Sequence, residues 1–340
     1  MKQTITTMFV ALLAGLIVTG CGGRQTESVE ETSAEEVVKI GYLVKQPEEP
    51  WFQVEWKYAA KAGDDAGFEV IQLAVPDAEK ALTAIDNLAA AGAQGFVICT
   101  PDVKLGPAII NKARVNGLKV MTVDDQFIGS DGQIMADVHH IGVAARDVGH
   151  VSGQSLWDEF QKRGWPIAET AAGIVTFQEL DTARERTEGI IERLVENGFP
   201  ADQIHETPQK TTDIPGSFDG MNILLTKHPG VKYWLVAGMN DTATLGAVRA
   251  LEGIGFSHEK AIGIGINGTD CIGELQKVEP TPFFGSILME ANVHGYDSSI
   301  AMHKWVTEGV EPERARFTGG VLITRGNFEQ ELKDHGMWPE

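Results

Sequence analysis

Beyond residue 36 the chain alternates between continuous apolar runs of strand length and longer stretches in which apolar residues recur with helical spacing. A run without polar alternation is typical of a strand that is buried on both faces, as in a parallel sheet covered by helices. The alternation therefore predicts an α/β fold with helices on both faces of its sheets. The predicted strands are Val37–Val44, Glu69–Ala74, Gly95–Thr100, Lys119–Val123, Ala172–Phe177, Tyr233–Met239 and Ala261–Ile266.

Two of the helical stretches have clear end signals. Residues 77–93 carry an apolar stripe and begin at Asp77, a predicted N-cap, and residues 182–198 follow Asp181 in the same way. Roughly ten strands are more than one common doubly wound sheet holds. We therefore expect two Rossmann-like domains.

The composition excludes some partners. The chain has 340 residues, of which 43% are hydrophobic and 22% are charged, as in soluble globular proteins. Its formal charge of −20 argues against nucleic acid, because phosphate binding needs a basic face.

The N-terminus reads as an export signal. Lys2 precedes an apolar core, Met8–Val18, which is too short to span a bilayer as a mature helix. Val18–Cys21 resembles the lipobox of bacterial lipoproteins, which implies a signal peptide over residues 1–20 and acylation of Cys21. The alternative is an ordinary secretory signal that contains a cysteine. Residues 21–36 are rich in Glu and are predicted to be a flexible acidic tether.

The other two cysteines, Cys99 and Cys271, lie in a strand-like run and at a helix start. An exported protein with two such thiols can form one disulfide. Because the surroundings of Cys99 look like core, we expect two free, buried thiols instead.

The loop after the first strand carries the clearest chemical signal. Residues 45–52 combine a cation, two carboxylates and two adjacent aromatic rings, and two prolines stiffen the backbone. Ligands of open α/β sheets bind at the carboxyl ends of strands. Charged groups beside a flat apolar ring suit a polyhydroxylated ring such as a sugar. The alternative is a plain helix start with Glu in its first turn.

Polar side chains also follow four later strands: Asp124–Asp125, Leu180–Arg186, Asn240–Asp241 and Asn267–Asp270. Carboxylate, guanidinium and carboxamide groups match hydroxyls that donate one hydrogen bond and accept two. Any one of these residues is equally typical of a helix N-cap, and for Asp181 and Asp241 we expect that role.

Several enzyme classes fit poorly. Gly263–Gly268 matches G-x-G-x-x-G, but it lies late in the chain and no partner acid follows at a strand end. Asp124 and Asp125 are adjacent on a strand, so we expect them to point to opposite faces and not to flank one glycosidic bond. His139 and His140 are expected to point apart in the same way, and the sequence has no zinc-binding pattern and no P-loop.

Nearly all of residues 37–335 resembles the bacterial L-arabinose-binding proteins, the soluble receptors of ABC sugar importers. The resemblance implies a periplasmic binding protein fold of type I, with two Rossmann-like lobes and a sugar in the cleft between them. Three hinge crossovers are expected near residues 143–147, 286–290 and 319–322. The resemblance rests on Lys39–Phe52, Gly95–Asp102, Val123–Phe127, Gln161–Trp165, Glu179–Arg184, Gly238–Asp241, Gly263–Gly268, Val293–Tyr296 and Val321–Arg325.

The lobes implied by the resemblance are discontinuous in sequence. The N-terminal lobe comprises 37–144 with 289–319, and the C-terminal lobe comprises 145–288 with 320–340. Asp125 is expected to face the anomeric hydroxyl. One departure is Val143, which stands where the family has a methionine beside the fifth ring carbon and leaves room for a galactose or fucose substituent. The sugar-contacting candidates are Lys45, Glu49, Trp51, Phe52, Asp124, Asp125, Arg186, Asn240, Asn267 and Asp270, with Leu180, Thr182 and Met239 in a secondary role.

The resemblance implies a sugar receptor, most simply for L-arabinose, that delivers its ligand to a membrane permease. The lipobox and the acidic tether are not part of the family's pattern, and they add the expectation of a lipid anchor. The protein is expected to be exported, monomeric and not an enzyme, with no cofactor, metal or nucleic acid. The alternatives are a sensor module that docks on a chemoreceptor and a carbohydrate-active enzyme.

Overall fold

The computed structural model describes residues 37–338. The predicted signal peptide, Cys21 and the acidic tether lie outside this range, as do the last two residues. Among the described residues, no helix is long and apolar enough to cross a membrane.

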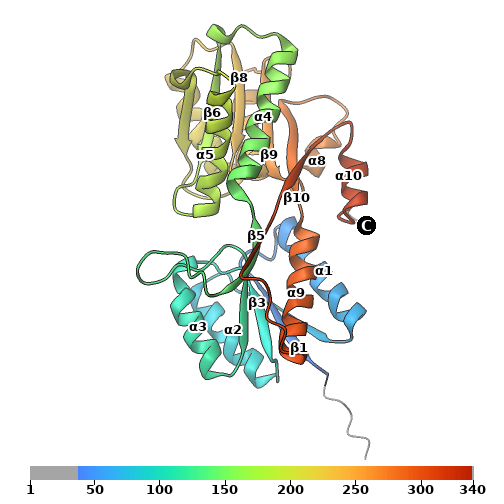
Figure 1. Cartoon of the computed structure of the whole chain (residues 1–340). Coiled ribbons are helices and arrows are strands. Elements are labelled where there is room, and N and C mark those ends of the chain that lie inside the picture. The colour runs from blue at the N-terminus through green and yellow to red at the C-terminus, as the bar shows by residue number, and fades with distance from the viewer. Residues whose placement is uncertain (1–36, 339–340) are drawn as a thin grey trace, which may run out of the picture. The chain divides into compact units, whose positions relative to one another are not determined.

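The first sheet has the order β11-β5-β4-β3-β1-β2, and every neighbouring pair in it is parallel (Figure 1). The predicted strand over 69–74 is its edge strand β2, none of whose residues is buried, so the expectation of burial on both faces was wrong there. The strands are β1 Lys39–Val44, β2 Glu69–Ala74, β3 Gly95–Ile98, β4 Lys119–Asp124, β5 His139–Val143 and β11 Ala315–Thr318.

The alternation of side chains along β1 explains why helices cover both faces of this sheet. Ile40 and Tyr42 belong to the core beneath α1 and α9, whereas Leu43 belongs to the core beneath α2 and α3. Asp77 caps α2 as predicted, because its side chain accepts a hydrogen bond from the Lys80 amide. The helices are α1 Pro50–Ala66, α2 Ala78–Ala90, α3 Gly106–Val115 after the short η1 Val103–Leu105, and α9 Ala291–Thr307.

The second sheet has the order β12-β10-β9-β8-β6-β7, and only the β10–β12 pair is antiparallel. Helices α4 and α5 pack together, as do α6 and α7, and both pairs contact this sheet. The strands are β6 Thr170–Thr176, β7 Ile204–Pro208, β8 Tyr233–Gly238, β9 Ala261–Asn267, β10 Phe283–Met289 and β12 Gly320–Thr324; the helices are α4 Ala145–Arg163, α5 Asp181–Glu196, α6 Ile214–Lys227, α7 Asp241–Gly253, α8 Ile272–Leu275, α10 Phe328–Asp334, η2 Ile167–Glu169 and η3 Ala201–Gln203.

The chain crosses between the two sheets three times. It leaves β5 for α4 at Ala144, leaves β10 for α9 at Glu290, and leaves β11 for β12 at Gly319. The amide of Ala144 donates to the carbonyl oxygen of Thr318 at 2.9 Å, which ties two of these crossovers together. The two-lobed α/β fold with three crossovers is confirmed. Below, "first lobe" and "second lobe" mean each sheet with the helices packed on it.

Candidate functional site

A cavity of about 700 Å³ lies where the carboxyl ends of strands from the two sheets meet, which is where α/β sheets bind ligands. Its volume is within the usual range for small-molecule sites. The structure brings all but two of the predicted sugar contacts to its wall: Lys45, Glu49, Trp51, Phe52, Asp124, Asp125, Leu180, Thr182, Arg186, Met239, Asn240 and Asn267.

The two exceptions are Val143 and Asp270, which are not among the lining residues. Val143 is buried in the core and pairs with Thr318 of β11, so its side chain packs among core residues and does not line the cavity. Asp270 accepts hydrogen bonds from Asn267 Nδ2 at 3.5 Å and from Thr269 Oγ1 at 3.2 Å. Its position therefore orients Asn267.

Asp125 joins the two lobes. Lys45 Nζ of the first lobe donates to its Oδ2 at 2.7 Å, and Thr182 Oγ1 of the second lobe donates to its Oδ1 at 2.7 Å. Burial alone would lower the pKa of Lys45, but the Asp125 carboxylate raises that pKa above its ordinary value. Lys45 therefore stays charged in a wall that is largely shielded from water.

Asp124 also reaches the cavity, which corrects the expectation that the two aspartates point to opposite faces. Its φ is +63°, so the chain leaves the regular strand geometry at this residue and the alternation of side chains ends. Trp51 Nε1 donates to Asp124 Oδ2 at 3.2 Å. Burial alone would raise the pKa of Asp124, but the hydrogen bond with His294 holds that pKa well below its usual range. Asp124 is therefore ionised at neutral pH and is unsuited to the role of a general acid.

Arg186 contributes an unsatisfied donor to the wall. Its Nη1 donates to the carbonyl oxygen of Met239 at 3.1 Å, whereas its buried Nε has no hydrogen-bond partner among the described residues. Burial lowers the pKa of Arg186, and the carboxylates of Asp125 and Asp124 oppose this effect. The free Nε is suited to an oxygen of a bound ligand.

The helix starts differ from two predictions. Leu180, not Asp181, is the N-cap of α5, and Asp181 is exposed at the first helical position. Asn240, not Asp241, caps α7, because its Oδ1 accepts from the Ala243 amide at 2.9 Å. The capping oxygen of Asn240 is therefore engaged, which leaves its amide nitrogen for a ligand.

Asp241 instead fixes a strained turn. Its carboxylate is buried, accepts from the Gly268 amide at 3.0 Å and hydrogen-bonds Ser286 Oγ. Asn267 and Gly268 have φ of +123° and +82°, so consecutive residues of this turn are in the left-handed region. Burial, followed by the nearby Asp270, raises the pKa of Asp241 to about 8.

The cavity has further lining residues that sequence reasoning missed. Gln46 Nε2 donates to Glu49 Oε1 at 2.7 Å, and burial, followed by Asp270, raises the pKa of Glu49 to about 7. Phe177 ends a predicted strand, and Glu179, Ala183 and Thr100–Asp102 lie in segments that carry the family resemblance, so their positions were an available signal. No predicted strand and no segment that carries the resemblance contains the others: Pro76, Val103, Lys104, Thr212 and Met289.

Comparison with protein families matches residues 37–331 to the periplasmic binding proteins and sugar binding domain of the LacI family. The chain belongs to the periplasmic binding protein family. As a periplasmic binding protein, it is 53% identical over 310 residues to the L-arabinose-binding periplasmic protein of Escherichia coli (strain K12), covering 91% of this chain and 94% of that relative. It is 42% identical over 328 residues to the ABC transporter L-arabinose-binding periplasmic protein of Azospirillum brasilense, covering 96% and 97%.

Solved structures show the same fold. A solute binding protein from Agrobacterium radiobacter in complex with D-arabinose aligns with a TM-score of 0.71 at 18% identity, covering 88% of this chain and 99% of that one. One from Actinobacillus succinogenes with bound D-allose aligns with a TM-score of 0.72 at 15% identity, covering 86% and 99%. These periplasmic binding proteins share the two-lobed architecture.

Both predicted thiols, Cys99 and Cys271, are free and buried, as expected. Cys99 Sγ lies 3.9 Å from Asp125 Oδ2. Burial raises the pKa of each thiol well above its ordinary value, so neither is a nucleophile at neutral pH.

Proposed function

We propose that this protein is the sugar receptor of a bacterial ABC importer, that it binds L-arabinose between its lobes, and that it releases the sugar unchanged to a membrane permease. The observation that carries the proposal is the cavity wall, in which both lobes supply charged and amide groups beside Trp51 and Phe52. Relatives that cover nearly the whole chain are named for L-arabinose binding.

The wall supplies hydrogen-bonding groups around an apolar surface. Lys45, Glu49 and the two aspartates come from the first lobe, and Arg186, Asn240 and Asn267 come from the second. A carboxylate such as Asp125 accepts hydrogen bonds from more than one direction, so it can serve either anomer of a sugar. Trp51 and Phe52 offer flat faces to the C–H groups of the ring.

A sugar that contacts both lobes favours the closed state over the open state of the same protein. The lobes that turn against each other are proposed to be 37–144 with 289–319, and 145–288 with 320–340. The crossovers at Ala144, Glu290 and Gly319 are the hinges. Closure would hide the ligand from water and create the surface that the permease recognises.

Calorimetry with L-arabinose, D-galactose and D-fucose tests the ligand assignment. We expect saturable binding, tightest for L-arabinose, with compaction in small-angle scattering. Sugar recovered after incubation should be chemically unchanged by NMR, which separates a receptor from an enzyme. Failure of all three sugars to bind would refute the proposal. Val143 does not line the cavity, so its size does not decide between L-arabinose and the two sugars with a larger substituent. All three sugars are therefore included.

We also propose that the mature chain is anchored through an acylated Cys21, because Val18–Cys21 follows an apolar signal core. Cys21→Ala should abolish palmitate labelling and release the protein from the membrane fraction. Unchanged labelling would mean that the signal is an ordinary secretory one. The monomeric state and a chemoreceptor partner stay predictions.

A further inference from the structure

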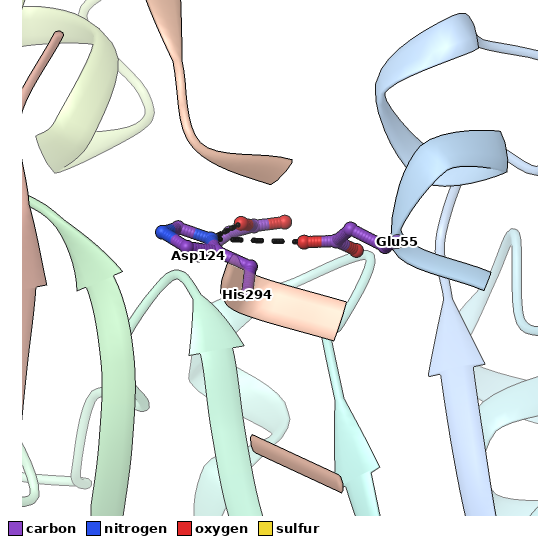
Figure 2. Close-up of side chains that lie close together, drawn as sticks. All are labelled: Glu55, Asp124 and His294. Carbon is purple, nitrogen blue, oxygen red and sulfur yellow. Dashed lines mark hydrogen bonds and ion pairs between the residues drawn. The ribbon is translucent and has the colours of Figure 1, made fainter. Parts of the chain in front are cut away.

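Behind the cavity wall, three ionisable side chains from different elements meet (Figure 2). His294 of α9 places its Nδ1 2.8 Å from Asp124 Oδ1 at the end of β4 and 3.7 Å from Glu55 Oε1 of α1. Glu55 and His294 have no exposed side-chain surface, whereas Asp124 also lines the cavity. The cluster therefore touches the cavity through one carboxylate.

The other imidazole nitrogen points to the crossovers. His294 Nε2 lies 2.9 Å from Thr318 Oγ1. Thr318 is the last residue of β11, directly before the third crossover, and its carbonyl oxygen accepts from Ala144 in the first. The His294 amide donates to the carbonyl oxygen of Glu290 in the second crossover. One residue thus connects a cavity carboxylate to all three crossovers.

The neighbouring groups determine the charge of His294 and of Asp124. Burial alone would lower the pKa of His294, but the hydrogen bond with Asp124 and the nearby Glu55 carboxyl group raise it to about 9. Burial, followed by Asp124, raises the pKa of Glu55 well above its ordinary value. At neutral pH the cluster therefore holds an imidazolium beside the ionised Asp124 carboxylate.

Other ionisable groups face the cluster. Lys45 is cationic and pairs with Asp125, next to Asp124. Burial, followed by the charge of His294, lowers the pKa of His140 to about 4, so its imidazole is neutral. Burial raises the pKa values of Tyr42 and Cys99, which are neutral as well. His294, with a pKa of about 9, is therefore an ionisable group in direct contact with Asp124 that loses its charge as the pH rises above neutral.

We propose that His294 is a positioning residue for sugar binding, which holds the ionised Asp124 carboxylate against the cavity and couples it to the crossovers through Thr318. This inference rests on the proposed sugar-binding function. When the lobes turn, Thr318 and Glu290 move with the crossovers, and His294 transmits the change to Asp124. Glu55 is the second acidic neighbour of the imidazole, but neither of its buried carboxyl oxygens has a hydrogen-bond partner among the described residues.

The same three side chains could be considered as a metal site, because their ligand atoms lie within 4.8 Å of one another. Two ligands of one tetrahedral zinc ion lie about 3.4 Å apart, given bond lengths of roughly 2.0–2.1 Å. The 2.8 Å between His294 and Asp124 is instead a hydrogen-bond distance, and the other imidazole nitrogen is engaged by Thr318. The geometry therefore favours a hydrogen-bonded cluster.

Three variants of the full chain separate the two bonds of the imidazole. His294→Asn keeps a donor near the Nδ1 position and loses the contact with Thr318. Thr318→Val removes the same contact from the other side without changing side-chain shape. His294→Leu removes both. The matched control is His139→Asn, because His139 is also buried in the first lobe but its ring, among the described residues, hydrogen-bonds only the carbonyl oxygen of Glu313.

We expect His294→Leu to weaken L-arabinose binding about tenfold or more, since it leaves a charged acceptor without its partner. His294→Asn and Thr318→Val should each weaken binding about two- to fivefold and reduce sugar-induced compaction in small-angle scattering to a similar extent. His139→Asn should bind sugar within about twofold of the parent protein.

A spectroscopic readout distinguishes positioning from a structural defect. Trp51 Nε1 donates to Asp124 Oδ2, so the indole N–H resonance of Trp51 reports on that carboxylate. In sugar-free protein this resonance should titrate together with the His294 ring, with a midpoint near 9. The titration should persist in His139→Asn and disappear in His294→Asn, which remains informative if the Leu variant does not fold.

Three results would overturn the inference: binding by His294→Leu within about twofold of the parent, a His294 ring that titrates below neutral pH, or stoichiometric zinc binding that Glu55→Gln abolishes. If the parent protein binds no L-arabinose, the proposed function fails on its own. The Trp51 titration then still tests whether His294 controls Asp124.

Discussion

Thr182 Oγ1 donates a hydrogen bond to Asp125 Oδ1 across the boundary between the lobes, at 2.7 Å. Asp125 is almost fully buried, and its other oxygen accepts from Lys45 of its own lobe. Both oxygens of one cavity carboxylate are therefore engaged, one by each lobe. A bound sugar hydroxyl must fit beside these two donors. We therefore expect Asp125 to take part both in closing the lobes and in contacting the sugar.

Thr182→Val should loosen the closed state, because it removes the donor without changing the shape of the side chain. A net hydrogen-bond contribution of about 1 kcal/mol corresponds to roughly fivefold weaker sugar binding. Calorimetry and small-angle scattering measure the two effects, and Thr182→Ser should restore both. Unaltered affinity in Thr182→Val would mean that the bond does not contribute to closure.

Arg186→Ala should weaken sugar binding by roughly 30-fold or more, because removing one partner of a desolvated polar network costs about 2–5 kcal/mol. Arg186→Lys should rescue only part of the loss, since an ammonium does not reproduce the planar guanidinium. Arg193→Ala on the same helix is the control, because Arg193 pairs with Glu196 away from the cavity. An affinity within about threefold, with circular dichroism unchanged, would contradict a contact between Arg186 and the sugar.

Asp241 predicts a fall in stability with rising pH. Its folded-state pKa of about 8 exceeds the ordinary value of 3.8, so the folded protein binds this proton more tightly than the unfolded chain. The stabilisation is complete below about pH 4 and is lost as the pH rises to about 8. Asp241→Asn keeps an acceptor for Gly268 and should flatten this decline.

Urea unfolding of Asp241→Asn and of the parent between about pH 5 and pH 8 measures how far the free energy of unfolding falls in each protein. The fall in the parent should exceed the fall in Asp241→Asn by about 1 kcal/mol or more at pH 8. Asp181→Asn is the control, since Asp181 is exposed. Parallel curves for Asp241→Asn and the parent would show that Asp241 does not cause the decline.

Gly149→Ala should displace α5. A Cβ atom at Gly149 of α4 would lie 2.2 Å from the carbonyl oxygen of Arg186, so the two helices must separate to accept it. We expect a loss of about 1–3 kcal/mol in the free energy of unfolding and weaker sugar binding, since α5 carries Thr182 and Arg186. Gly253→Ala has open space around it and should leave both quantities nearly unchanged. Equal behaviour of the two variants would rule out close packing as the cause.

Six of the seven predicted strands are interior strands of the two sheets, whereas three of the four edge strands were not predicted. The run from Tyr233 to Met239 contains β8, which is covered on both faces, so its apolar residues reflect its burial directly. The run over 69–74 is interrupted by Glu69 and Gln72, and β2 has a neighbour on one side only, which accounts for its exposure. Strands β7, β11 and β12 lie at edges too, where mixed sequences give no clear periodicity.

The cavity wall was predictable where residues directly follow strands, because parallel strands bring their carboxyl ends to one edge. Asp124 and Asp125 were found in this way, but their orientation was not, because it depends on a left-handed residue at Asp124. His294 is the fourth residue of α9, a helix that is distant in sequence from Asp124. Only the folded chain reveals its contact with Asp124.

The pairing of β11 with β5 has a consequence for how the protein is made. The edge strand of the first sheet, Ala315–Thr318, is synthesised only after the entire second sheet except β12. The first sheet therefore lacks this edge strand until nearly all of the second sheet has been synthesised, and an earlier fragment exposes the unpaired edge of β5. An exposed strand edge is a site for pairing with other chains, so the order of synthesis leaves this edge unprotected until a late stage.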